Sequence, residues 1–248
     1  MPWGKTRHGP ASLTPTFMTG TITFDRGCSR AVCRNIALAA VMAMLAWCVL
    51  ALDADLMERT VSQRYGAQGL QSLNAWKTMM AGLTDAPEAE ILRRVNDHWN
   101  RTVRFGEDID IWRQDDYWAT PLETMGRGRG DCEDYVIAKY FTLRALGVPE
   151  SRLRLTYVRA RIGSASSGIS QAHMVLSYYA TTESMPLVLD NLVSSIQPAN
   201  TRTDLTPVFS FNAQGIYTGA AVQASSPVER LTRWRDLLLR MSSEGSIP

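Results

Sequence analysis

The sequence has 248 residues, enough for one domain of ordinary size with an additional segment. Its hydrophobic content of 45% is that of a globular chain with a sizeable core, and its net charge is +2. Five of the 26 basic residues precede residue 36, so the rest of the chain is close to neutral. A near-neutral domain gives no electrostatic argument for binding nucleic acid, and we expect no nucleic acid among its partners.

An uncharged apolar segment, residues 36–52, follows the basic N-terminal stretch. This order is typical of an export signal, and Val49-Leu50-Ala51 is a passable small-residue cleavage site. The segment is slightly short for a spanning helix, which usually needs about 20 apolar residues. We therefore predict that residues 1–53 are a basic N-region with an export signal, with a retained membrane anchor or a buried core helix as the alternatives.

Helical spacing of apolar residues follows, and it predicts helices over 69–83 and 86–103. Residues 105–130 are acidic, aromatic and then glycine-rich, which is typical of a loop. A further helix begins within RGRGDCEDY (127–135), where Asp131 is a natural N-cap.

The pattern then changes to the alternation of half-buried strands. Strands are predicted over 152–162, 172–179 and 185–191, with two more inside 207–219. Helices followed by an antiparallel sheet indicate an α+β domain, which we assign to residues 54–225.

Residues 226–248 form an amphipathic C-terminal helix and tail. A helix packed on its own domain is the favoured interpretation. A partner-binding or membrane-surface helix is the alternative.

Cys132 is the only cysteine beyond residue 48, so the exported domain has no disulfide framework and no zinc ligand set. His173 opens a predicted strand and Asp190 ends the next one. Paired strands can bring these two side chains together beside a cysteine at a helix N-terminus. Such a Cys-His-Asp group is suited to nucleophilic catalysis, in which the imidazole takes the thiol proton and the carboxylate orients the imidazole.

Three acids surround the candidate nucleophile: Asp131, Glu133 and Asp134. A catalytic cysteine works as a thiolate, and neighbouring negative charges oppose its ionisation. The sequence therefore indicates either that Cys132 is not catalytic or that a positive group lies beside it. The acids can also serve only as helix caps that complement the helix dipole.

Three stretches together resemble the bacterial transglutaminase-like cysteine proteinases of the LapG type: residues 116–149, AHMVLSYY (172–179) and PLVLDNL (186–192). Residues 202–217 also resemble the family, so the likeness runs from about residue 95 to 217. It implies a papain-like or transglutaminase-like fold and a periplasmic endopeptidase. The family's Cys, His and Asp fall on the same three residues that the spacing selected.

The resemblance also implies calcium beside the nucleophile, with two carboxylate ligands falling on Asp131 and Glu133. Asp134 stays undecided as a ligand, and Asp115 and Asp116 are weaker candidates. By the same resemblance, the substrate is a large surface adhesin that is cut near its N-terminus after a pair of alanines, releasing it and dispersing biofilm. The implied regulatory partner is the periplasmic domain of an inner-membrane cyclic di-GMP receptor.

Two other functions fit the same residues. A transglutaminase-like acyl transferase uses the same triad, because hydrolysis and transfer share an acyl-enzyme. A calcium-modulated binding protein with a disused triad is the non-enzymatic alternative, and the reactivity of the Cys132 thiol toward alkylating agents distinguishes it.

Overall fold

The computed structural model of the chain describes residues 30–164, 166–219, 221 and 223–246, and for residues 30–53 it describes the backbone alone. The chain divides into two compact units, residues 1–47 and 48–248. All candidate functional residues lie in the second unit.

The first helix, α1, runs from Arg30 to Ala81 and is interrupted at Gly66, whose backbone is not helical (φ 62°, ψ −151°). The predicted export segment, residues 36–52, falls in this helix, but its side chains lie outside the described part of the chain. Its role as signal or anchor therefore stays a prediction. Among the described residues, no helix combines the length and apolarity needed to cross a membrane.

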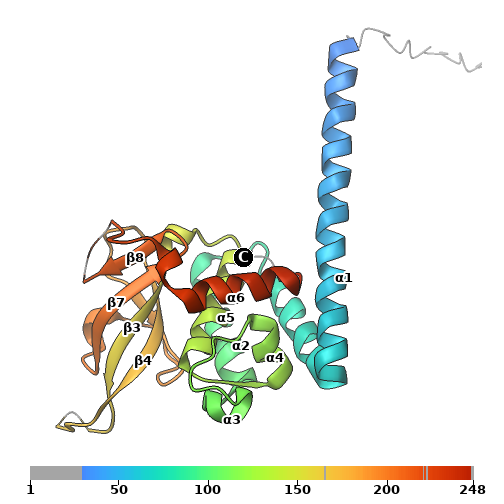
Figure 1. Ribbon diagram of the computed structural model, residues 1–248. Coiled ribbons are helices and arrows are strands. Elements are labelled where there is room, and N and C mark those ends of the chain that lie inside the picture. Colours follow the sequence, from blue (N-terminus) through green and yellow to red (C-terminus); the bar gives the residue numbers. More distant parts are fainter. Residues whose placement is uncertain (1–29, 165, 220, 222, 247–248) are drawn as a thin grey trace, which may run out of the picture. The chain divides into compact units, whose positions relative to one another are not determined.

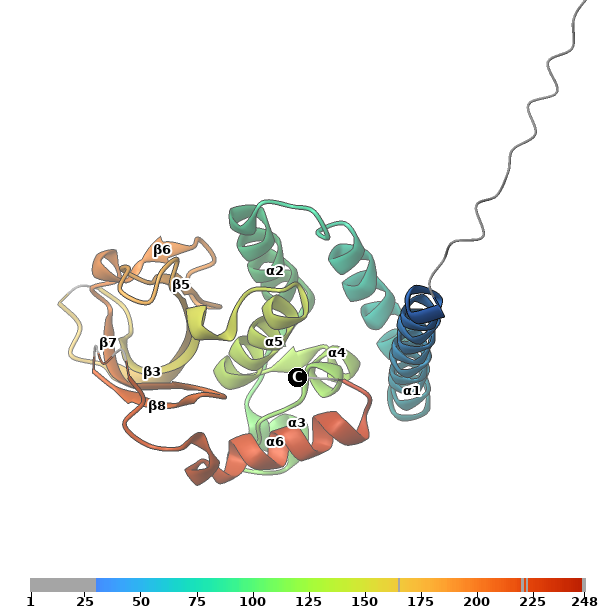
Figure 2. The ribbon, with the colours of Figure 1, turned by 90° about the horizontal axis from the view of Figure 1, so that it is seen from above.

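The helices of the second unit surround α5, which packs against α2 on one side and against the sheet on the other (Figures 1 and 2). After α1 they are α2 (Glu88–Thr102), α3 (Asp108–Trp112), α4 (Pro121–Arg127), α5 (Cys132–Ala145) and α6 (Thr232–Ser243), with single 3-10 turns at Glu150–Arg152, Ala199–Thr201 and Val228–Arg230. The core lies between α5, α2 and the sheet, and fully buried Trp99, Tyr140 and Leu155 belong to it.

The main sheet is antiparallel throughout, with strand order β6-β5-β4-β3-β7-β8, and it is strongly curved (Figure 2). Its strands are β3 (Leu153–Arg161), β4 (Ser170–Tyr178), β5 (Leu187–Leu189), β6 (Gln197–Pro198), β7 (Leu205–Asn212) and β8 (Gly215–Thr218). A small parallel pair joins β1 (Arg104–Phe105) to β2 (Arg129–Gly130). The predicted α+β class, helices first and antiparallel sheet afterwards, is confirmed.

Two details differ from the sequence prediction. Strand β3 is buried on both faces over most of its length, and Val158 of β3, Val175 of β4 and Val188 of β5 form a second apolar cluster, separate from the main core. The predicted loop 105–130 contains α3 and α4. The signal for α4 was present in the sequence as a Thr120–Glu123 capping box with Pro121 between them.

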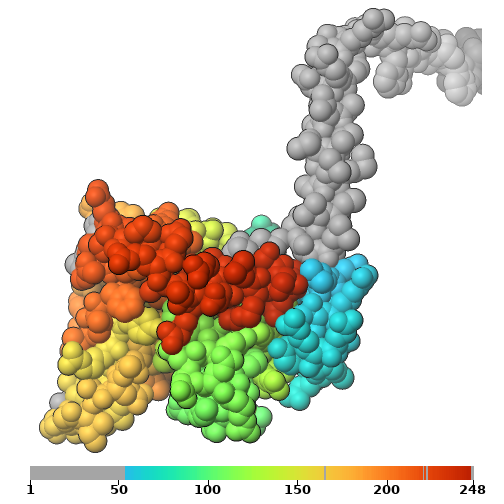
Figure 3. Space-filling model, in the orientation of Figure 1, coloured from blue at the N-terminus to red at the C-terminus, as the bar shows by residue number. Residues whose placement is uncertain are grey.

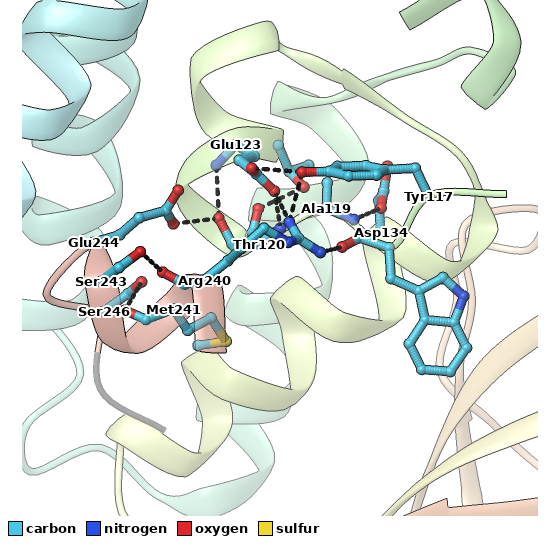
Figure 4. Close-up of polar contacts among 12 residues, drawn as sticks. Tyr117, Ala119, Thr120, Glu123, Asp134, Arg240, Met241, Ser243, Glu244 and Ser246 are labelled. Atoms are coloured by element: carbon cyan, nitrogen blue, oxygen red, sulfur yellow. Dashed lines mark hydrogen bonds and ion pairs between the residues drawn. The ribbon is translucent and has the colours of Figure 1, made fainter. Parts of the chain in front are cut away.

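Helix α6 packs on its own unit through the buried side chains of Trp234, Leu237 and Met241. In the space-filling view the C-terminal residues form a continuous band across the molecule (Figure 3). Polar contacts hold the same helix against α4 (Figure 4). Arg240 is the centre of this network: it pairs with buried Glu123 and donates to the Trp118 carbonyl at 2.6 Å.

Replacing Arg240 by alanine should lower the free energy of unfolding by about 2 kcal/mol, because it leaves the buried Glu123 carboxylate without one of its hydrogen-bond donors. The matched control is Arg233→Ala on the same helix. Arg233 forms an exposed pair with Asp116, so its loss should cost less than about 1 kcal/mol. Urea unfolding of both variants measures the difference, and equal losses would contradict this account of α6.

Candidate active site

Cys132 is the first residue of α5, and its position is set by a capping box at the start of that helix. The Asp131 carboxylate accepts from the Asp134 N–H at 3.4 Å, and the Asp134 carboxylate accepts from the Asp131 N–H at 3.3 Å. Two glycines bring the chain to this point. Gly128 ends α4 in the left-handed region (φ 61°), and a Cβ on Gly130 would lie 2.8 Å from Asp134 Oδ2. The glycine-rich segment thus serves the backbone geometry before the cysteine.

The thiol of Cys132 contacts both its own helix and strand β4. It donates to Glu133 Oε2 at 2.7 Å, and the backbone N–H of Met174 on β4 hydrogen-bonds to the sulfur. Burial raises the pKa of the thiol far above its ordinary value. The charge and hydrogen bond of Glu133 and the charge of Asp131 raise the pKa further, and Met174 opposes them only in part. Without a cation at this place, Cys132 is held as a thiol.

His173 and Asp190 form a buried hydrogen-bonded pair. His173 Nε2 lies 2.8 Å from Asp190 Oδ1, and the side chains are 2% and 0% exposed. Burial raises the pKa of Asp190, but hydrogen bonds from His173 and Arg202 outweigh it and lower the pKa to about 2. An ionised carboxylate can only accept, so Nε2 carries the proton. Nδ1 is then the ring nitrogen left to act as a base toward a thiol.

The structure therefore brings the predicted strand-opening His and strand-ending Asp together, as β4 and β5 are neighbours in the sheet. Cys132 reaches the same strand one residue along, at Met174. Among the described residues the thiol has its hydrogen bonds with Glu133 and Met174, and none joins it to His173. The pairing of thiol and imidazole stays a prediction.

A cluster of three carboxylates lies beside Cys132, formed by Asp108, Asp131 and Asp134, with one oxygen of each within 4.8 Å of the others. Asp108 Oδ1 is buried and has no hydrogen-bond partner. Burial, together with the charges of Glu133, Asp134 and Asp108, raises the pKa of Asp131 to about 10. Burial likewise raises the pKa of Asp108 to about 6. The cluster fits a hard divalent cation such as calcium, which prefers several carboxylate oxygens.

Two residues at this site were not predicted from the sequence as candidates. Asp108 lies on the short helix α3, and its only sequence signal was the acidic stretch GEDIDIW (106–112). Arg202 donates to Asp190 Oδ2 at 2.7 Å. Residues 202–217 resemble the family in sequence, but nothing in that stretch indicated a role for Arg202 itself.

The structure gives each of the other acids considered from the sequence its own contacts. Asp134, which the sequence left undecided as a metal ligand, belongs to the three-carboxylate cluster. Glu133 is bonded to the thiol, and its role as a metal ligand stays a prediction. Asp116 pairs with Arg233 at 2.8 Å.

The fold and this cysteine-centred site correspond to a known class: the chain belongs to the bacterial transglutaminase-like cysteine proteinases, whose family model matches residues 71–207. Among solved structures it is similar to Legionella pneumophila LapG, with 40% identity over 75% of this chain and 95% of that chain and a TM-score of 0.63.

Two further structures of that protein are similar to the same degree. The calcium-bound form has 38% identity over 74% of this chain and 97% of that one, with a TM-score of 0.63. The EGTA-treated form has 39% identity over 75% and 95%, with a TM-score of 0.64. No curated protein sequence matches the chain. The family resemblance inferred from the sequence is confirmed.

Proposed function

We propose that this chain is a calcium-dependent cysteine endopeptidase in which Cys132 is the nucleophile, His173 the general base and Asp190 the group that orients His173. The observation that carries the proposal is the buried His173–Asp190 pair on β4 and β5, with Cys132 reaching the same strand at Met174. Membership of a cysteine proteinase family supports it.

The reaction follows from these groups. Nδ1 of His173 takes the thiol proton, and the Cys132 sulfur attacks the carbonyl carbon of the scissile peptide bond. The backbone N–H of Cys132, at the first position of α5, has no acceptor within the helix and is placed to stabilise the developing oxyanion. His173 returns the proton to the leaving amine. Water then hydrolyses the acyl-enzyme with His173 again as base.

Calcium is the proposed cofactor, held by Asp108, Asp131 and Asp134. Its charge at the cluster would offset the carboxylates that oppose ionisation of Cys132. The orphaned buried Asp108 Oδ1 and the raised pKa of Asp131 support a cation there. Similar structures described as calcium-bound and EGTA-treated support calcium as its identity.

The proposed substrate is a large surface adhesin cut near its N-terminus after a pair of alanines, so that cleavage releases it and promotes biofilm dispersal. The proposed regulator is the periplasmic domain of an inner-membrane cyclic di-GMP receptor. Family resemblance supports both.

The test is to incubate residues 54–248 with N-terminal adhesin fragments, with calcium or with a chelator, and to identify the products by mass spectrometry. We expect two fragments, the first ending in a free carboxylate after the alanine pair, and no cleavage of a fragment in which two glutamates replace the alanines. A product joined to an added primary amine would favour acyl transfer. No product with calcium present would refute the proposed substrate.

We also propose that the enzyme works in the periplasm after export. N-terminal sequencing of protein recovered from the periplasm should then place the first residue near 52–55. A chain in the membrane fraction that still carries residues 36–52 would instead establish the anchored form.

A further inference from the structure

Arg202 lies between the last 3-10 turn before β7 and the strand itself, and its side chain is 3% exposed. Its guanidinium bridges two carboxylates. Nη2 donates to Asp190 Oδ2 at 2.7 Å, and Nη2 and Nε donate to the two oxygens of Asp204 at 2.7 and 3.0 Å. Asp204 therefore fixes the plane of the guanidinium, and the guanidinium reaches Asp190 from that fixed position.

Asp190 is held at both carboxylate oxygens and at its backbone carbonyl. Oδ1 accepts from His173 Nε2 and from the Leu192 N–H at 3.0 Å, while the Asp190 carbonyl accepts from Asn100 Nδ2 at 2.7 Å. Among the described residues, Arg202 supplies the hydrogen bond to Oδ2, the oxygen opposite His173. Removing it leaves the carboxylate free to rotate about its Cβ–Cγ bond and so to move the oxygen that holds the imidazole.

We propose that Arg202 is a positioning residue of the active site, which acts on the reaction through Asp190 and His173. Asp204 supports it in that role. This inference rests on the proposed function, because an orientation of His173 matters only if His173 serves as the base.

The charges around Asp190 agree with this assignment. The hydrogen bonds of His173 and Arg202 keep the buried Asp190 ionised, and an ionised Asp190 selects the tautomer with the proton on Nε2. Lys139 on α5 is a second basic group whose charge interacts with Asp190, although burial lowers the pKa of Lys139 to about 7. Lys139 is fully buried, and its Nζ has no hydrogen-bond partner among the described residues, so Lys139 cannot fix the direction of the carboxylate.

A double-mutant cycle separates this role from a structural one. The variants are Arg202→Met, Asp190→Asn and the double variant, each measured with calcium for kcat and KM of adhesin-fragment cleavage and for the alkylation rate of Cys132. We expect Arg202→Met to lower kcat about 100-fold with KM nearly unchanged, as for a displacement of about 1 Å at a catalytic group. In the Asp190→Asn background the same change should have almost no further effect.

Arg202→Lys should have a higher kcat than Arg202→Met but a lower one than wild type, because lysine keeps the positive charge but loses the bidentate hydrogen bonds to Asp204. Arg144→Met is the matched control: it removes a half-buried ion pair with Glu150 at the other end of α5 and should leave kcat unchanged. Losses in kcat that multiply in the double variant, or a wild-type kcat in a folded Arg202→Met protein, would overturn the inference.

If Arg202→Met does not fold, as judged by its thermal unfolding, Asp204→Asn replaces it in the cycle. This change weakens the hydrogen bonds that orient Arg202 and leaves Asp190 itself unchanged. We therefore expect a smaller loss of kcat, and almost no further loss when it is combined with Asp190→Asn. A wild-type Cys132 that resists alkylation in calcium would overturn the triad and this inference with it. A reactive wild type with an equally reactive Arg202→Met variant would overturn the inference alone.

Discussion

Cys132→Ala should reduce cleavage by a factor of about 10³ or more, the usual effect of removing a member of such a triad. The fold should stay intact, because the change removes one sulfur atom at a partly exposed helix start and alanine favours the helix. Cleavage rates and thermal unfolding midpoints of the variant and the wild type measure the two effects. Activity above about 1% of wild type in a folded variant would remove Cys132 from the role of nucleophile.

His173→Ala should be comparably severe, and the chain contains a matched control for it. His98 lies on α2, where it packs edge-to-face on Trp99 with ring centroids 5.6 Å apart, and among the described residues its side chain has no hydrogen bond or ion pair with Cys132, His173 or Asp190. His98→Ala should therefore leave kcat nearly unchanged. Equal losses from the two substitutions would mean that His173 has no special part in the reaction.

The candidate triad was largely predictable from the sequence because local patterns mark the elements that carry it. Cys132 follows a capping residue and Asp190 follows β5. His173 was predicted to open its strand, but it is the fourth residue of β4, which begins at Ser170. One short connection, residues 179–186, places β4 and β5 side by side in the antiparallel sheet, so local patterns were enough to bring His173 and Asp190 together.

The supporting residues were not predictable in the same way. Asp108 belongs to a five-residue helix, too short for helical spacing to reveal, and it meets Asp131 only because β1 pairs with β2 and folds the intervening chain back. Arg202 reaches Asp190 across a turn that leads into β7, a strand that pairs with β3 and β8 but not with β6, the strand before it in sequence. Long-range pairing of this kind leaves no local pattern.

Calcium should control cleavage through the three-carboxylate cluster beside Cys132. With a chelator present, burial and the charges of Glu133 and Asp131 hold the thiol protonated, so cleavage and alkylation should both be slow. Added calcium should restore both. Magnesium should substitute poorly, because it requires a tight octahedral shell and retains its waters.

Asparagine substitutions separate metal binding from helix capping at this site. Asparagine is about as good an N-cap as aspartate, so Asp131→Asn should change stability little. Asp131→Asn, Asp108→Asn and Asp134→Asn should each weaken calcium binding at least about tenfold, since ligand charge tunes the affinity of such sites. Asp110→Asn is the matched control, because Asp110 lies on the same helix as Asp108 but is exposed.

Glu133→Gln tests the remaining predicted ligand and the origin of the thiol's resistance to ionisation in one experiment. Because the Glu133 charge raises the pKa of Cys132, its removal should speed alkylation in the presence of a chelator. If Glu133 also binds the ion, as family resemblance implies, calorimetry should show weaker calcium binding by the same variant. If alkylation without metal is faster but calcium affinity is unchanged, Glu133 acts on the thiol and is not a calcium ligand. Calorimetry that detects no calcium binding by the wild-type domain would refute the cofactor, because the carboxylates would then oppose the nucleophile with nothing to offset them.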